Sequence, residues 1–273
     1  MPPEPLLYES HCHTPLCKHA RGEPVDYAAV AEQRGFTGII FTCHCPLPDG
    51  ISLSVRMAPE EYDRYVAMVA AAREKFAGRV DVRLGLESDY YPGVEPWLEK
   101  LHARAPLHHV IGSVHPQVPD YRNRFFTGDW FAYQQIYFEH IAAAAETGLY
   151  DTIGHPDLIK NEAPAEWRFA RIEPFIARAL DRIAATGVAM EINTSGLHKT
   201  IPEMNPGLAM LQHMHARGIP VVIGADAHRP ERVGADYDLA LRQLEAAGYR
   251  EISFFLDRKR QAVPLAAAKA ALR

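Results

Sequence analysis

The sequence predicts an α/β protein: a TIM-like barrel of seven or eight parallel βα units, formed by a single domain over residues 1–273. Apolar runs of strand length alternate with segments of helical periodicity along the whole chain. The strands are nearly continuous apolar runs, which is typical of a parallel sheet covered by helices. No segment rich in proline, glycine or serine divides the chain, whose 273 residues fit one barrel of this class.

Eight segments have the length and the apolar composition of buried strands. Each of the first seven is followed by a segment with helical periodicity, so they make up seven or eight βα units. We expect closure into a barrel, and the pattern is compatible with seven strands as well as with eight. The predicted strands cover residues 6–11, 38–44, 80–88, 108–115, 151–155, 188–195, 220–228 and 251–255.

Seven segments between these strands repeat apolar residues with the period of a helix. They cover residues 26–35, 59–78, 94–104, 133–148, 171–187, 207–218 and 236–248. Glycine commonly follows the last turn of a helix because it adopts the left-handed conformation without strain. Six glycines end these segments: Gly35, Gly78, Gly148, Gly187, Gly218 and Gly248.

The charge of the chain restricts its partners. The formal net charge is −5 and the longest basic run is the short DRKR at 257–260, which argues against a nucleic-acid scaffold but permits an enzyme that acts on small phosphates.

The N-terminal MPPEPLLYE lacks the basic and apolar segments of a signal peptide. No apolar run approaches the length of a membrane span. We therefore expect a cytoplasmic protein without a membrane partner.

Potential metal ligands end six of the predicted strands. In α/β barrels the carboxyl ends of the strands converge on one face, so we expect these side chains to form one site. Imidazoles combined with carboxylates favour Zn²⁺, Mn²⁺ or Fe²⁺, and nine ligands exceed the needs of one ion. The sequence therefore predicts two or three divalent transition-metal ions. The nine residues are His11, His13, His19, His44, Glu87, His115, His155, Asp226 and His228.

Four cysteines, too few for a disulfide framework in a chain of this size, lie close to these histidines: Cys12, Cys17, Cys43 and Cys45. Neighbouring residues of a strand face opposite ways, so Cys12 faces away from His11 and His13, and its counterparts at 43 and 45 face away from His44. Cys17 follows in a loop, where strand alternation gives no guidance. We expect all four cysteines to be buried, non-ligating side chains.

Six motifs resemble, in order, those of the polymerase-and-histidinol-phosphatase (PHP) superfamily of metal phosphoesterases. They are HCH, FTCHCPLP, GLESDYY, IGSVHP, IGHPDLIKN and GADAHRPERVG. The resemblance covers nearly the whole chain, and the motifs are specific as a set although HxH or DxH alone would be weak. The spacing and flanking residues are most similar to the histidinol-phosphate phosphatase branch.

This resemblance implies a distorted seven-stranded barrel with three metal ions. The first ion would be held by His11, His13, Glu87 and Asp226, the second by His19, His44 and His228, and the third by Glu87, His115 and His155. It also implies a hydroxide between the metals as the nucleophile, with Asp226 orienting it. Asp226, His228 and Glu87 are accordingly the residues assigned to catalysis.

The chain departs from the family where the substrate would bind. Ser10, preceded by Glu9, stands where an acidic residue is common, Pro116 replaces an aromatic residue, and SGLHK at 195–199 lacks an expected arginine. These changes leave the ligands intact but affect the contacts to phosphate and alcohol. The candidate phosphate contacts are Lys160, His198, Lys199 and Arg229, the candidate acceptors for a substrate amine are Glu191 and Asp89, and residues 116–135 are a candidate lid.

The resemblance implies hydrolysis of L-histidinol phosphate, a small phosphate ester, to histidinol and phosphate in histidine biosynthesis. A PHP phosphoesterase acting on nucleotides or short oligonucleotides is one alternative, and a non-catalytic metal-binding accessory module is another. Retention of every candidate ligand argues against the accessory module. A metal-dependent amidohydrolase usually places a lysine between its metals, and no lysine ends a strand in the equivalent place.

The remaining histidines have structural explanations. His102, His140, His213 and His215 fall within helical segments and are expected to be surface or packing residues. His108 and His109 precede the apolar part of the fourth strand, the end of a barrel strand that contributes to stability rather than to chemistry.

Overall fold

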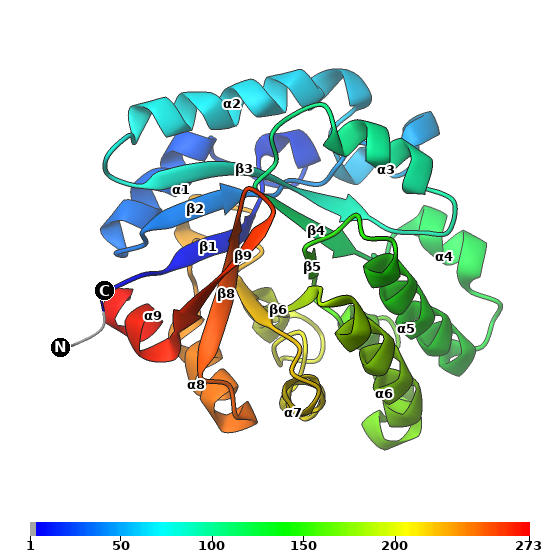
Figure 1. Cartoon of the computed structure of the whole chain (residues 1–273). Helices are drawn as coiled ribbons and strands as arrows, with labels where there is room; N and C mark the ends of the chain where they lie inside the picture. Colours follow the sequence, from blue (N-terminus) through cyan, green and yellow to red (C-terminus); the bar gives the residue numbers. More distant parts are fainter. Residues whose placement is uncertain (1–3) are drawn as a thin grey trace.

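The computed structural model describes residues 4–273, and in it nine strands form one sheet whose order in space follows their order in sequence (Figure 1). The first eight pair in parallel, and the ninth pairs antiparallel with the eighth. The strands are β1 (Tyr8–Cys12), β2 (Gly38–Phe41), β3 (Asp81–Asp89), β4 (His109–Ser113), β5 (Thr152–Ile153), β6 (Ala189–Asn193), β7 (Val221–Gly224), β8 (Glu251–Leu256) and β9 (Lys259–Pro264).

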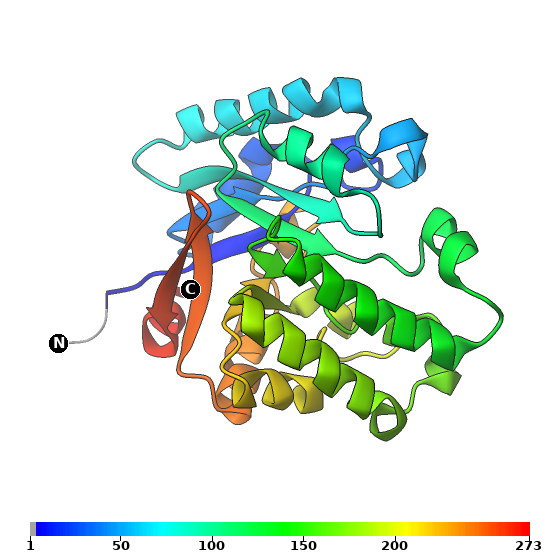
Figure 2. The same ribbon diagram turned by 45° about the vertical axis from the view of Figure 1, so that its right-hand side comes forward.

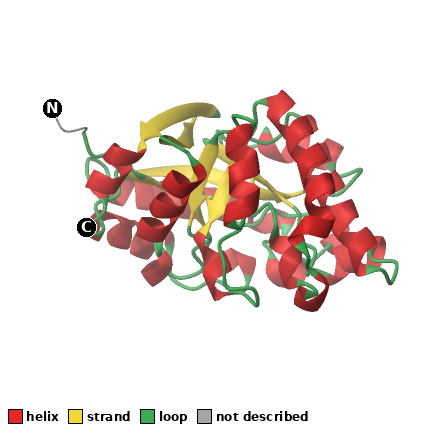
Figure 3. Cartoon of the chain, turned by 90° about the horizontal axis from the view of Figure 1, so that it is seen from below, coloured by secondary structure: helices red, strands yellow, loops and turns green. Residues whose placement is uncertain are grey.

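Helices surround the sheet, as Figures 2 and 3 show from two further directions. All seven predicted helices are present, and Gly187 and Gly248 end two of them in the left-handed conformation. The helices are α1 (Pro24–Gln33), α2 (Tyr62–Lys75), α3 (Glu95–His102), α4 (Pro119–Phe125), α5 (Trp130–Glu146), α6 (Phe169–Thr186), α7 (Leu208–Ala216), α8 (Tyr237–Ala247) and α9 (Leu265–Ala271). Among residues 4–273, no helix combines the length and apolarity needed to cross a membrane.

Backbone contacts join the two sides of the predicted barrel at its carboxyl-end mouth, and Tyr8 of β1 stacks on Phe254 of β8 with ring centroids 4.1 Å apart. Cys12 forms an isolated parallel bridge with Ala227, whose backbone N–H donates to the His11 carbonyl at 3.0 Å. The buried Glu9 strengthens this contact, because its Oε1 accepts the backbone N–H groups of His11 at 3.0 Å and Ala225 at 3.1 Å. The sheet is otherwise open between β1 and β9. The α/β barrel class is confirmed, whereas full closure by a continuous strand ladder is not observed.

The β8–β9 hairpin was not predicted beyond its first strand. Asp257 and Arg258 connect the two strands with φ values of 51° and 61°. Two consecutive left-handed residues are typical of the tight type I′ hairpin turn, which usually contains asparagine or glycine. Because neither is present, the DRKR segment resembles an ordinary basic loop in the sequence. Helices α4 and α9 were also missing from the prediction.

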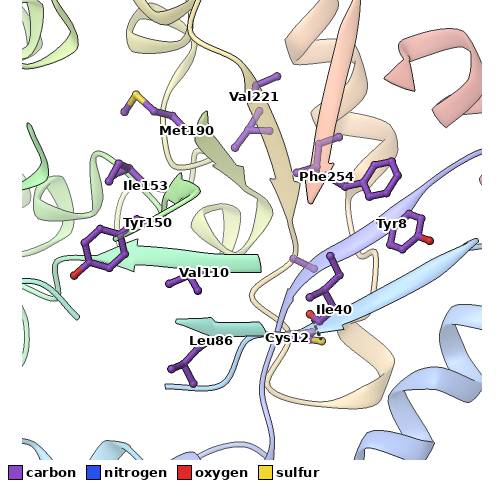
Figure 4. Packing of buried hydrophobic residues seen from close by; sticks show 14 of the residues in the cluster. Tyr8, Cys12, Ile40, Leu86, Val110, Tyr150, Ile153, Met190, Val221 and Phe254 are labelled. Carbon is purple, nitrogen blue, oxygen red and sulfur yellow. Dashed lines mark hydrogen bonds between the residues drawn. The ribbon is translucent and has the colours of Figure 1, made fainter. Parts of the chain in front are cut away.

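Most apolar side chains of the strands lie in one large core, and Ala189, Val222 and Phe255 form a second, smaller cluster. Figure 4 shows Ile40, Leu86, Val110 and Met190 from β2, β3, β4 and β6, all buried. Cys12 lies in this core, where its thiol donates to the Ile40 carbonyl at 3.5 Å. The alternation of β1 therefore turns Cys12 into the wall, as expected, and leaves its two neighbouring histidines for the mouth.

Candidate metal centre

The nine predicted ligands lie at the mouth formed by the carboxyl ends of the strands. His11 and Glu87 belong to β1 and β3, and the others follow the strands directly or, for His19, lie beyond a short 3₁₀ turn at Pro15–Cys17. Two of them, His155 and Asp226, have left-handed backbones with φ values of 27° and 52°. Such conformations cost free energy in residues other than glycine and often mark functional sites.

Glu87 is the centre of the cluster and is fully buried. Its Oε2 lies 2.7 Å from His44 Nδ1, 3.5 Å from His11 Nε2 and 3.7 Å from His13 Nε2. Its Oε1 lies 3.0 Å from His155 Nε2 and 3.4 Å from His115 Nε2. One carboxylate therefore touches five of the histidines, which is the position expected of a bridging ligand.

Asp226 forms a second contact point, which shares the Nε2 atoms of His11 and His13 with Glu87. Its Oδ1 lies 3.1 Å from His13 Nε2 and 3.8 Å from His11 Nε2. His228 stacks on His13 with ring centroids 3.9 Å apart, and His19 stacks on His228 at 4.4 Å. The nine side chains thus form one connected cluster that is elongated from His155 to His19.

Several groups within the cluster are compact enough to hold an ion, because their ligand atoms all lie within 4.8 Å of one another. His11, His13 and Asp226 form one such group, and this corresponds to the first predicted metal position together with Glu87. Two further compact groups consist of predicted ligands. One contains His13, His44 and His228, and the other contains Glu87, His44 and His115.

The charges of the buried carboxylates are maintained by the imidazoles. Burial opposes the ionisation of Glu87, but the surrounding histidines, with His44 nearest, hold its pKa well below the usual range. Burial also opposes the ionisation of Asp226, and His11 and His13 hold its pKa low in the same way. Burial alone would lower the pKa of His115, but Asp89 and Glu87 raise it to about 10. A metal ion would displace that proton, because only neutral imidazole is a ligand.

The residues fit divalent transition-metal ions. Among residues 4–273, fifteen buried side-chain nitrogen and oxygen atoms have no hydrogen-bond partner, and seven of them belong to the predicted ligands. Buried polar atoms are normally paired, so such a concentration indicates a missing partner. His44 Nδ1 and Glu87 Oε2 are both unpaired although they lie only 2.7 Å apart. Imidazoles with two carboxylates are a donor set for Zn²⁺, Mn²⁺ or Fe²⁺.

Residues behind the ligands orient them, and the sequence did not reveal this role. Glu191 Oε1 lies 2.7 Å from His11 Nδ1, and its Oε2 accepts the His155 backbone N–H at 2.7 Å. The predicted role of Glu191 as an acceptor for a substrate amine is therefore replaced by a positioning role. Ser195 donates to Asp226 Oδ2 at 3.1 Å from the NTSG segment that follows β6. Outer partners of this kind fix the orientation of metal ligands.

All four cysteines are buried, as expected, and one of them lies beside the predicted metal ligands. Cys43 accepts the backbone N–H and the hydroxyl of Thr14 at 3.4 and 3.2 Å. Cys17 is buried, and its sulfur lies within 4.8 Å of ligand atoms of His19 and His228. A ligand atom of His13 and the sulfur of Cys43 also lie within 4.8 Å of the Cys17 sulfur. The loop therefore brings Cys17 to the metal ligands, which strand alternation could not predict.

A cavity of about 520 Å³ opens onto the cluster. Its wall contains six of the nine ligands, namely His19, His44, His115, His155, Asp226 and His228. Residues 117–120, from the predicted lid segment, form part of another side, and α4 begins there. Arg56 also lines it, paired through both terminal nitrogens with Asp89 at 3.1 and 2.7 Å. Asp89 is thus neutralised by Arg56 and is not a free acceptor for a substrate amine.

Of the four predicted phosphate contacts, only Lys199 lines this cavity. Lys160 is fully buried, and its ammonium donates to Asp157 Oδ2 and to the Met204 carbonyl, both at 2.9 Å. His198 is exposed and lies 3.2 Å from Asp236 Oδ2. Arg229 is half exposed, with Glu231 at 4.0 Å. Lys160, His198 and Arg229 therefore each lie near a carboxylate of the protein and do not line the cavity.

The remaining buried histidines have protein partners outside the cluster. His109 lies 2.8 Å from the Thr152 hydroxyl and stacks on Phe255. His140, on α5, lies 2.7 Å from the Tyr121 hydroxyl on α4. Burial lowers the pKa of His140 to about 4. This histidine therefore remains neutral in the folded protein at pH values where an unfolded chain would protonate it.

We expect His140 to make folding sensitive to acid. Its folded pKa of about 4 is below its value in an unfolded chain, about 6.5, so the unfolded state binds more protons between these pH values. The stabilising contribution is complete above pH ~6.5 and decreases as pH falls towards 4, by at most about 1.4 kcal/mol per unit. Urea unfolding of the wild type and of His140→Gln should therefore differ more at pH 7 than at pH 4.5. A constant difference would contradict this assignment.

An α/β barrel with a buried cluster of histidines and carboxylates at its mouth defines a metal-binding barrel protein with a site for more than one ion. Residues 9–195, more than half of the chain, match the PHP domain. The chain belongs to the PHP domain family.

A relative agrees with this membership, and a solved structure has a similar fold. A protein of Deinococcus radiodurans named "probable histidinol-phosphatase" is 37% identical, with 91% of this chain and 96% of that protein covered. The histidinol-phosphatase of Bacillus subtilis is 28% identical, with 86% and 98% covered. The structure of histidinol phosphate phosphatase from Lactococcus lactis, complexed with zinc, L-histidinol and phosphate, has a TM-score of 0.77 at 19% identity, with 93% and 98% covered.

Proposed function

We propose that this protein is a metal-dependent phosphomonoesterase that hydrolyses L-histidinol phosphate to L-histidinol and phosphate in histidine biosynthesis. The observation that carries the proposal is one cavity of about 520 Å³ that opens directly onto six of the predicted ligands. Family membership and the names of the relatives support the same reaction. The proposal treats residues 1–273 as one cytoplasmic domain whose partner is a small phosphate ester.

The nine ligands would hold two or three divalent ions, with Glu87 between them. When bound, such ions supply a water of lowered pKa and stabilise the charge that develops on the phosphoryl group. Asp226 Oδ1 lies 3.1 Å from His13 Nε2, and the Ser195 hydroxyl donates to Asp226 Oδ2 at 3.1 Å. These two contacts hold the Asp226 carboxylate in position. We assign to Asp226 the orientation of the attacking water, and to Glu87 and His228 the placement of the ions.

The two charged ends of the substrate would contact different walls of the cavity. Lys199 follows β6 and can approach the phosphate beside the metal ligands. Asp120, at the start of α4, lines another part of the wall. The backbone N–H and the hydroxyl of Ser52 donate to its Oδ2 at 2.8 and 2.9 Å, which holds the carboxylate in place. We assign Asp120 as the acceptor for the substrate ammonium, in place of Glu191 and Asp89.

The decisive experiment is a phosphate-release screen of the metal-loaded protein with histidinol phosphate, p-nitrophenyl phosphate, mononucleotides and short oligonucleotides. We expect the highest kcat/KM with histidinol phosphate, because contacts to its amine and imidazole are used in the transition state. Equal kcat/KM for histidinol phosphate and p-nitrophenyl phosphate would reduce the assignment to a general phosphoesterase. A preference for nucleotides would replace it.

Asp120→Asn is expected to impair the amine contact selectively. Loss of one charge-assisted hydrogen bond should lower kcat/KM for histidinol phosphate about 10- to 100-fold. Turnover of p-nitrophenyl phosphate, which has no amine, should be unchanged. Ser52→Ala should give a smaller effect in the same direction. Equal losses with both substrates would show that Asp120 does not recognise the amine.

Lys199→Met is expected to weaken the phosphate contact. We expect KM to rise about tenfold, equivalent to ~1.4 kcal/mol, with both substrates because both carry the phosphate. The metal content of the variant should match that of the wild type, since Lys199 contacts none of the ligands. His198→Met is the matched control, and its KM should be unchanged because His198 faces Asp236. If KM rose for His198→Met but not for Lys199→Met, His198 would be the phosphate contact instead.

A further inference from the structure

Cys17 is placed among metal ligands by the turn that precedes it. Pro15 begins the 3₁₀ turn, and the Cys17 N–H donates to the Thr14 carbonyl at 3.1 Å. Lys18 then reverses the chain with a left-handed φ of 71°. This geometry buries the Cys17 side chain completely and brings its sulfur within 4.8 Å of ligand atoms of both His19 and His228.

Both histidines present their Nε2 atoms for a ligand. His19 Nδ1 lies 2.7 Å from the Cys17 carbonyl, and His228 Nδ1 lies 3.0 Å from the Asp226 carbonyl. A backbone carbonyl at Nδ1 fixes the tautomer in which Nε2 carries the free lone pair. His228 Nε2 is buried without a hydrogen-bond partner.

A third histidine has a ligand atom within 4.8 Å of the same sulfur. His13 is fully buried, its Nδ1 has no hydrogen-bond partner, and it forms a compact group with Cys17 and Cys43. Cys43 differs from Cys17 because Thr14 donates to it twice, at 3.4 and 3.2 Å. The role of Cys43 is therefore accounted for by packing, while Cys17 faces three imidazoles.

We infer that the Cys17 thiolate is a ligand of the metal ion held by His19 and His228. The inference rests on the metal centre of the proposed function and adds a sulfur donor to it. Thiolate ligands favour zinc over manganese, whereas a position made only of imidazole and carboxylate accepts either ion. One position of the centre is therefore zinc-selective, and the remaining position or positions are less discriminating.

Reconstitution of the metal-free protein with Co²⁺ tests this ligand without using activity. Cobalt bound at any position gives visible d–d absorption, and cobalt bound to a thiolate adds a charge-transfer band in the near ultraviolet. We expect both in the wild type. Cys17→Ser and Cys17→Ala should lose the charge-transfer band but keep d–d absorption. Cys12→Ser is the matched control, because Cys12 is equally buried but faces the Ile40 carbonyl, and it should keep both.

The outcomes separate the two proposals. Visible absorption without a charge-transfer band in the wild type would overturn the sulfur ligand and leave the metal centre intact. Absence of both the visible absorption and the charge-transfer band would overturn the sulfur ligand and the metal centre together. Persistence of the band in the Cys17 variants, with its loss in Cys43→Ser, would transfer the ligand to Cys43 and refute the assignment.

X-ray absorption at the zinc edge of the wild-type protein makes the test independent of how the variants fold. A Zn–S shell near 2.3 Å is expected beside the shells of nitrogen and oxygen at about 2.0–2.2 Å. Zinc affinity is measured by competition with a chromophoric chelator. The most weakly bound zinc ion of Cys17→Ser should have a Kd at least about tenfold higher than that of the wild type. Its preference for zinc over manganese should fall as well. Only nitrogen and oxygen shells in the wild type would refute the inference.

Discussion

Replacing Glu87 with glutamine is expected to lower kcat/KM for histidinol phosphate by more than about 1,000-fold, the upper range for loss of one group that stabilises a developing charge. Glu87 lies within 3.7 Å of five histidines, so its charge acts on five of the eight other predicted ligands. Its replacement removes the negative charge that would bridge the ions. We therefore expect loss of at least one bound metal ion as well, measured by elemental analysis after saturation with Zn²⁺ or Mn²⁺.

The matched control is Glu9→Gln, which changes another fully buried carboxylate. Glu9 accepts hydrogen bonds from backbone N–H groups and from the Tyr237 hydroxyl at 3.0 Å, and it contacts no imidazole ring. This variant should lose stability but keep its metal content per folded chain. Full metal content and activity in Glu87→Gln would exclude Glu87 as the bridging ligand.

The position of Glu87 could be predicted because it depends on topology alone. Parallel strands end on one face of a barrel, and side chains alternate along each strand. These two rules place Glu87 and His11 together and turn Cys12 into the wall. They need no knowledge of which residues far apart in the sequence become partners, and the family motifs then distinguish a metal centre from a chance cluster.

The roles of Glu191 and Cys17 could not be predicted in this way. Glu191 orients His11 across 180 residues of sequence, and nothing local distinguishes it from an acceptor that faces the cavity. Cys17 lies in a turn, where the alternation of strands does not apply. Asp257 and Arg258 form a hairpin turn without the usual asparagine or glycine. In each case the partner or the backbone conformation is decided by tertiary contacts.

The role of Lys160 also could not be predicted from the sequence. Its place after β5 suggests a phosphate contact. In the structure the following 3₁₀ turn, Leu158–Asn161, directs its ammonium inwards. Asp157 receives it at 2.9 Å, and the Met204 carbonyl, 44 residues away, accepts a second hydrogen bond. Asp157 also accepts from Asn205 Nδ2 at 2.6 Å and from the Gly207 N–H at 2.9 Å. Lys160 therefore joins the loop after β5 to the loop after β6.

Lys160→Met is accordingly expected to destabilise the fold rather than to change substrate binding. Removing one partner of a buried ion pair leaves the other charge uncompensated, at a cost of about 3–5 kcal/mol. Each kcal/mol corresponds to a fall in Tm of roughly 2–4 °C for a protein of this size. Calorimetry should show this loss for Lys160→Met but not for Lys199→Met, whose ammonium lines the cavity.

A double-variant cycle separates the charge from the packing. In Lys160→Met the Asp157 carboxylate keeps two hydrogen bonds but has no cation, so adding Asp157→Asn should recover part of the lost stability. KM for histidinol phosphate should stay at the wild-type value in the folded fraction of both variants. Unchanged stability together with a raised KM would mean that the ammonium serves the phosphate after all, and that the inward ion pair is not its role.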